Sequence, residues 1–249
     1  MACNKETNLL YSFGRLSEIA KQFSHKDGWG ITWLNQDNRF ELHKGPKPIW
    51  ESRSAQNHVQ NARSKLIVVH ARKSLKDDAS KKRAHPFRQV FLDKEWIFAH
   101  NGGIESPAPK KCKPRSDVDS ERFFCYLIDT MEEVNRNMVY DEKRLVIEAL
   151  RHALKKAKIV TALNFIMANP RNLFVFRYHV KNPDYYNVLY LTRSWQSTKG
   201  AELGKEKGEI ATIFSSQRLS TNEIWHPLKN AHLAIVPIGE PEKLEIVSI

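Results

Sequence analysis

The chain has 249 residues, of which 41% are hydrophobic and 27% are charged, and its formal net charge is +12. This composition is typical of a globular protein, and no run of about 18 apolar residues is present that could form a membrane span. The clusters of basic residues are not interleaved with aromatic residues that would stack on bases, so they favour solvated faces over a nucleic-acid surface. We therefore expect no membrane and no nucleic-acid partner.

The first half of the chain predicts two helices and four strands. Apolar residues recur every three or four positions in the first helix, at 17–23, and more weakly in the second, at 54–62. The strands are expected at 30–34, 39–43, 65–72 and 95–100, of which 65–72 is the clearest because it has the continuous apolar run of a buried strand. The polar and basic segment 73–88 is predicted to be a long loop, and such loops are often functional.

The second half predicts two helices followed by strands. One helix opens near Ser116, with Asp117 as an expected cap, and carries an apolar face made of Phe123, Phe124, Leu127, Ile128 and Met131. The other helix is expected at 142–158, and strands at 163–168, 172–179, 186–192, 209–215, 231–237 and 243–247. Strands, then helices, then more strands predict antiparallel sheets covered by helices, in a single domain over residues 1–249.

The cysteine pattern suggests a reducing environment. Cys3, Cys112 and Cys125 are widely spaced, their number is odd, and they form no Cys-x-x-Cys pair. This argues against a disulfide framework and for a cytoplasmic protein. The N-terminus also lacks the apolar core of a secretory signal. Cys125 lies among apolar residues of a predicted helix and is expected in the core.

The segment Trp96-Ile97-Phe98-Ala99-His100-Asn101-Gly102-Gly103-Ile104 is the most informative one. Asn-Gly is a strong turn signal, so we expect the strand to end at His100-Asn101-Gly102-Gly103. Backbone N–H groups of Asn101 and Gly102, with the Asn101 side-chain amide, could then stabilise an oxyanion. An ordinary hairpin turn is the alternative interpretation.

Two further side chains suggest a substrate. Arg72, just past the buried strand, offers a planar guanidinium suited to a carboxylate. Asp119, in the first turn of a helix, offers a carboxylate suited to an ammonium group. Together they would hold both ends of an α-amino acid, and with the oxyanion donors they predict hydrolysis of an acyl bond on an amino-acid substrate.

Five motifs in this order resemble the class II glutamine amidotransferase domain of the N-terminal nucleophile hydrolases, in its small stand-alone branch. They are His25-Lys26-Asp27-Gly28-Trp29-Gly30, His70-Ala71-Arg72, Ala84-His85-Pro86-Phe87, Ala99-His100-Asn101-Gly102 and Asp119-Ser120-Glu121. The resemblance covers about residues 7–240, including Asn222-Glu223-Ile224-Trp225.

The resemblance implies a fold and a set of roles. The fold is α+β, a four-layer αββα sandwich of two antiparallel sheets flanked by helices. Arg72 would bind the glutamine α-carboxylate, Asp119 the α-amino group, and Asn101 with Gly102 would form the oxyanion hole. The motif histidines His70, His85 and His100 are placed with the substrate-binding residues, and their individual roles stay open.

The implied reaction is cleavage of the γ-amide of glutamine, or of a γ-glutamyl peptide or thiol conjugate, through a cysteine thioester. It requires no metal and no organic cofactor. Because no synthase domain is attached, any acceptor of the released ammonia would be a partner protein.

The nucleophile is where this sequence departs from the family. A family member has cysteine at position one, where its free α-amino group can serve as the base, whereas this sequence reads Met1-Ala2-Cys3. Three alternatives follow: a short strand of about 5–6 residues carrying the true cysteine lies upstream; the chain is an inactive homologue that binds glutamine or glutamate or regulates a partner; or Cys3 is the nucleophile after trimming.

Overall fold

The apolar run at residues 66–69 lies in the middle of strand β4 (Ser64–Ala71), where the sequence predicts a strand. Ile67 packs in a core cluster with residues of helix α1 (Leu10–Gln22). Leu66 and Val68 pack in another cluster, with residues of a second sheet. A strand with apolar side chains on both faces has to be covered on both faces.

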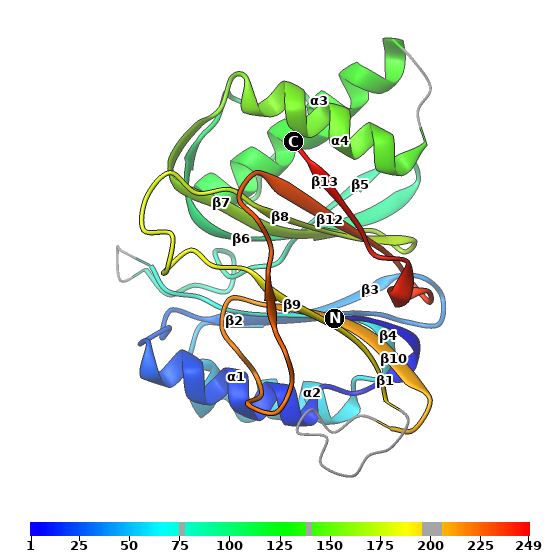
Figure 1. Cartoon of the computed structure of the whole chain (residues 1–249). Coiled ribbons are helices and arrows are strands. Elements are labelled where there is room, and N and C mark those ends of the chain that lie inside the picture. Colours follow the sequence, from blue (N-terminus) through cyan, green and yellow to red (C-terminus); the bar gives the residue numbers. More distant parts are fainter. Residues whose placement is uncertain (75–77, 138–140, 196–205) are drawn as a thin grey trace.

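The computed structural model describes residues 1–74, 78–137, 141–195 and 206–249. In it, both faces of β4 are covered. Figure 1 shows four layers, with two antiparallel sheets in the middle and helices on both outer faces. Helices α1 and α2 (Arg53–Asn61) lie on one sheet, and α3 (Asp119–Asn137) and α4 (Glu142–Leu154) lie on the other. The predicted αββα sandwich is therefore confirmed.

Within the described residues, the sheet covered by α1 and α2 has the strand order β11-β9-β10-β1-β4-β2-β3. The other sheet has the order β13-β12-β8-β7-β6-β5. The strands of the first sheet are β1 (Ala2–Thr7), β2 (Trp29–Leu34), β3 (Phe40–Gly45), β4, β9 (Leu189–Trp195), β10 (Glu209–Ser215) and β11 (His226–Pro227). Those of the second are β5 (Phe87–Phe91), β6 (Lys94–Glu105), β7 (Lys158–Ala168), β8 (Asn172–Arg177), β12 (His232–Pro237) and β13 (Glu245–Ser248).

Several helix boundaries differ from those predicted. Helix α1 begins at Leu10, before the predicted start at 17, and α4 ends at Leu154 instead of continuing to 158. Strand β7 starts at Lys158, because Ile159, Val160 and Thr161 are β-branched and favour a strand. The apolar face predicted for α3 is confirmed, since all five of its predicted residues pack in the core between the helices and the second sheet. None of the described helices is long and apolar enough to cross a membrane.

The prediction that His100-Asn101-Gly102-Gly103 ends its strand is wrong. Strand β6 continues through this segment to Glu105, and its pairing with β7 shifts register between Gly102 and Ile104. Gly102 has φ +141°, and a Cβ there would lie 2.0 Å from the Ala162 carbonyl oxygen. Asn-Gly therefore lies inside a long strand and not in a hairpin turn; its positive φ falls where the β6–β7 pairing becomes irregular and the extra residues, 160–162, belong to β7.

Strand β1 was not predicted, because its residues 4–6 are polar. It pairs with β10 through Ala2 and Cys3 and with β4 through Ala2 and Thr7. Ala2 and Cys3 at one end of the strand and Thr7 at the other end are buried, and Glu6 is exposed. The strand therefore lies inside the sheet although its middle residues are polar.

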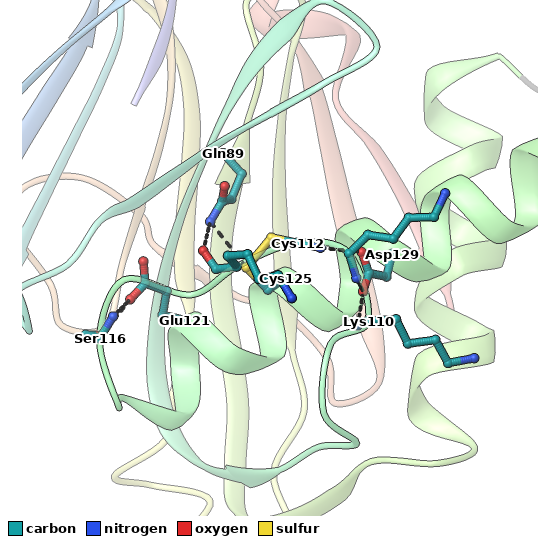
Figure 2. Close-up of a disulfide and its surroundings, with 9 residues drawn as sticks. Gln89, Lys110, Cys112, Ser116, Glu121, Cys125 and Asp129 are labelled. Carbon is teal, nitrogen blue, oxygen red and sulfur yellow. Dashed lines mark hydrogen bonds between the residues drawn. A yellow bond between two sulfur atoms is a disulfide. The ribbon is translucent and has the colours of Figure 1, made fainter.

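The structure corrects the expectation of no disulfide. Cys112 and Cys125 form one, with a Cα–Cα distance of 5.1 Å across 13 positions of sequence. The segment 106–118 folds back along α3, which brings Cys112 beside the buried Cys125 (Figure 2). Sequence spacing alone does not reveal this contact. The cytoplasmic location stays a prediction, and a disulfide does not favour it.

Candidate active site

A cavity of about 1080 Å³ lies where β4 and β6 approach the start of α3. Its lining includes every predicted site residue except Cys3: His70, Arg72, His85, His100, Asn101, Gly102 and Asp119. Cys3 is fully buried and packs in the core cluster that contains Phe13 of α1. The structure therefore brings the predicted binding residues together and does not bring Cys3 to them.

Arg72 is positioned by the loop that precedes β2. The Arg72 backbone N–H donates to the Gly28 carbonyl at 2.8 Å, and the Asp27 N–H donates to the Arg72 carbonyl at 3.0 Å. The Arg72 side chain is almost fully buried, and its Nη1 donates to the Asp27 carbonyl at 3.4 Å. The Asp27 carboxylate in turn accepts the Ser74 N–H at 2.7 Å. The motif that ends in Gly28-Trp29-Gly30 thus clamps the arginine at the cavity wall.

Asp119 is fixed at the first turn of α3. Its Oδ2 accepts the Ile104 N–H at 3.1 Å, and its Oδ1 accepts the Ser120 N–H at 2.7 Å. These bonds tie the start of α3 to the last residues of β6. A carboxylate held this way lines the cavity as a fixed acceptor for an ammonium group.

His100 is bonded through both ring nitrogens. Its Nε2 lies 3.2 Å from the Ala162 carbonyl oxygen, which can only accept, so we assign the proton to Nε2. Nδ1, at 2.8 Å from Ser120 Oγ, then accepts the single hydroxyl proton in place of Asp119 Oδ1, which lies 3.2 Å from the same oxygen. Burial lowers the pKa of His100, which favours this neutral ring. His100 therefore links the start of α3 to strand β6.

His70 and His85 form a buried pair, with ring centroids 4.5 Å apart. Burial lowers the pKa of His70 to about 3 and that of His85 well below its ordinary value, so both rings are neutral at physiological pH. Among the described residues, His70 Nδ1 and both ring nitrogens of His85 have no hydrogen-bond partner. These atoms give the cavity wall polar groups that carry no charge.

The oxyanion residues lie where the pairing of β6 with β7 becomes irregular. Asn101 is paired with Asn164 of β7, and Gly102 with Leu163, before the register shifts. Gly102 and Gly103 line the cavity at this register shift. The register shift therefore supplies the local break in pairing that the sequence predicts from a turn.

The cavity continues along the line of β1. The Met1 ammonium donates to the Ile67 carbonyl at 2.9 Å, and the Ile67 N–H donates to the Met1 carbonyl at 3.1 Å. Farther along, residues 68–71 of β4 pair with β2 on one side and line the cavity. Residues 213–215 of β10 also line the cavity. The space between β4 and β10 leads from Met1 to Arg72.

Some polar residues at the cavity were not predicted to belong to it. Asp78 and Arg83 line it from the predicted long loop. Asp117, predicted as the helix cap, lies two positions before α3 begins at Asp119; it lines the cavity, and its Oδ2 accepts a hydrogen bond from Arg83 Nη2 at 2.6 Å. No motif marks Asp78 or Arg83, so the composition of the loop was the only signal for them. Within the described part of the chain, no group of three or more His, Cys, Asp or Glu side chains is arranged to hold a metal ion.

Known proteins are similar to this chain over most of its length. YafJ of Escherichia coli K12 is 25% identical to this chain over 260 residues, which cover 96% of each protein. A structure from Pseudomonas aeruginosa PA01, described as a predicted glutamine amidotransferase, has a TM-score of 0.64 at 20% identity and covers 90% of this chain and 87% of its own.

A larger enzyme shares the fold. Glutamine phosphoribosylpyrophosphate amidotransferase of B. subtilis has a TM-score of 0.59 at 12% identity, over 96% of this chain and 46% of that one, so this chain spans about half its length. The family model of class II glutamine amidotransferases matches residues 1–248. This chain therefore belongs to the class II glutamine amidotransferases.

Proposed function

We propose that the cavity binds glutamine, or a γ-glutamyl compound, and cleaves its γ-amide. The observation that carries this proposal is that Arg72 and Asp119 line the same cavity as Asn101 and Gly102. Arg72 takes the α-carboxylate and Asp119 takes the α-ammonium group. The γ-carbonyl then extends toward Asn101 and Gly102, where an oxyanion would be stabilised.

The proposed reaction has two acyl-transfer steps. A cysteine thiolate attacks the γ-carbonyl carbon, and Asn101 and Gly102 stabilise the resulting oxyanion. The C–N bond breaks, the amine or ammonia leaves with a proton, and a γ-glutamyl thioester remains. Water then attacks the thioester, which releases glutamate and restores the thiol. Ammonia released in this way would pass to a partner protein if the chain serves a biosynthetic reaction.

We place the nucleophile on a segment that precedes Met1 and continues β1 through the cavity. Met1 lies opposite Ile67, so antiparallel pairing would bring a residue about five positions before Met1 opposite Arg72. The cavity walls beside this path include Val68 and Phe214, which suit a short apolar strand. This length agrees with the 5–6 residues expected from the family resemblance.

A second candidate is a glutamine-binding or regulatory protein without catalysis. It is favoured by one observation: no cysteine of the described residues lines the cavity. The same binding residues would serve such a protein, since Arg72 and Asp119 recognise the amino acid and not the bond that breaks.

Binding of the amino acid is tested by titration calorimetry with L-glutamine and L-glutamate. Arg72→Ala and Asp119→Ala should each weaken binding at least about 30-fold, because each removes one partner of a charge pair. Arg39→Ala and Asp37→Ala are matched controls, since both residues are exposed in the β2–β3 turn and should leave affinity unchanged. Unchanged affinity in the Arg72 and Asp119 variants would remove the proposed site.

Catalysis is tested on protein purified from its native source. A mass above 28.9 kDa with cysteine in the first sequencing cycle, together with glutamate release from glutamine, would support the enzyme. A native chain that begins at Met1 or Ala2 and releases no glutamate would support the binding protein. A native chain trimmed to begin at Cys3 that hydrolyses glutamine would support the third alternative.

A further inference from the structure

The guanidinium of Arg72 already holds a carboxylate. Arg72 Nη2 donates to Asp78 Oδ1 at 2.9 Å, and the Arg72 and Asp78 side chains are 8% and 20% exposed. Both residues line the cavity. A hydrogen bond from Ser74, with Arg72 and Arg83 nearby, lowers the pKa of Asp78 to about 2, so its carboxylate is ionised at neutral pH. Asp78 therefore offers Arg72 the same chemical group as the α-carboxylate of an amino acid.

Asp78 is also bonded to a second arginine. Its Oδ2 accepts a hydrogen bond from Arg83 Nη1, and Arg83 Nη2 donates to Asp117 Oδ2. The four side chains form a row of alternating charges along the cavity wall, in the order Arg72, Asp78, Arg83 and Asp117. Separation of Asp78 from Arg72 would thus leave Asp78 paired with Arg83.

This row makes an exchange of carboxylates inexpensive. A buried charge that loses its partner is strongly destabilising. If a substrate carboxylate replaces Asp78 on Arg72, Arg72 stays paired with the substrate and Asp78 stays paired with Arg83. Both charges are therefore paired before the exchange and after it.

We propose that Asp78 is an internal carboxylate that competes with the substrate α-carboxylate for Arg72. This rests on the proposed function, because it requires that Arg72 be the carboxylate site. The competition acts only on ligands that bring an α-carboxylate to Arg72, so an amide that lacks this group binds with nearly the same affinity whether or not Asp78 is charged. Asp78 also weakens the binding of glutamine.

The test compares two ligands and two variants by titration calorimetry. L-Glutamine has an α-carboxylate, whereas 4-aminobutanamide has the same chain and amide without it. In Asp78→Asn, which keeps the shape and removes the charge, glutamine should bind about tenfold tighter than to the unmodified chain. The affinity for 4-aminobutanamide should rise by less than about twofold, since this ligand does not compete with Asp78. Asp37→Asn is the matched control and should change neither affinity.

Other outcomes separate this inference from the proposed function. If Asp78→Asn weakens glutamine binding or leaves it unchanged, Asp78 orients Arg72 or is passive, and the competition is wrong. If both ligands gain affinity equally, the variant acts on the whole cavity and not on the carboxylate site, which also overturns it. If Arg72→Ala binds glutamine normally, the proposed function itself fails, whatever Asp78 does.

Discussion

Two loops flank the cavity, and they are held in opposite ways. The described residues of the first loop, 72–74 and 78–86, are held at the cavity by charged side chains, through Asp78 between Arg72 and Arg83. The second loop, 106–118, lines the cavity only near its two ends, and its middle is held on α3 by the Cys112–Cys125 disulfide and by backbone N–H groups that bond to α3 (Figure 2).

The difference follows from what each loop has to do. Ion pairs can exchange partners, so the first loop can respond to a ligand that carries a carboxylate. A disulfide and hydrogen bonds from backbone N–H groups to α3 cannot exchange partners in this way. The second loop therefore keeps the start of α3, and with it Asp119, in one place. We expect changes in the second loop to alter stability and changes in the first to alter affinity.

The largest effect on the free energy of unfolding is expected from removal of the disulfide. Replacing Cys112 and Cys125 together by serine should lower the free energy of unfolding by about 3 kcal/mol, the loop-closure contribution expected for a loop near this length. Denaturant unfolding of the variant and of the unmodified chain measures this difference. A reductant should destabilise the unmodified chain by a similar amount and leave the double variant unchanged. Glutamine affinity should stay within about twofold, since neither cysteine lines the cavity.

The sequence predicted those parts of the site that depend on local pattern. The apolar run placed Arg72 at a strand end, and the polar start of an amphipathic segment placed Asp119 at a helix start. The sequence could not predict contacts made by the two loops, because these depend on where a long polar segment folds in space. Asp78 and the Cys112–Cys125 pair are of this kind, and neither has a local signature.

Strands β1 and β6 were misjudged for a related reason. Residues 4–6 of β1 are polar and only Glu6 among them is exposed, although the strand is central in the sheet between β10 and β4. The Asn101-Gly102 pair allows positive φ inside an irregular strand as well as in a turn, so composition cannot distinguish the two. Only the partner strands decide, and these are distant in sequence.

An intermediate effect is expected at Asp129, which accepts the backbone N–H groups of Lys110, Lys111 and Cys112. Asp129→Ala should cost about 2 kcal/mol of unfolding free energy, because it removes a charged acceptor from three donors. Glu132→Gln on the same helix is the matched control, since Glu132 binds exposed Lys111 and Arg136 and should change stability by about 0.5 kcal/mol or less. Equal effects in the two variants would mean that the backbone bonds do not hold this loop.

The smallest stability effect is expected at Asp78, and it should depend on pH. The pKa of Asp78 is lowered to about 2 in the folded chain, against about 3.9 for an unfolded aspartate. A lowered folded-state pKa contributes stability above the unfolded value, and this contribution is lost as the pH falls toward about 2. Asp78→Asn should therefore be less stable than the unmodified chain by about 1 kcal/mol or less near neutral pH, with a gap that closes under acid.

Denaturant unfolding of both proteins between about pH 6 and pH 2.5 measures this gap, and a gap that stays constant would show that the Asp78 charge is not its cause. The variant is expected to bind glutamine more tightly while it unfolds more easily. Asp129→Ala should unfold more easily without that gain. A loop whose ties compete with the ligand should show opposite changes in stability and affinity, and a loop whose ties lie elsewhere should not.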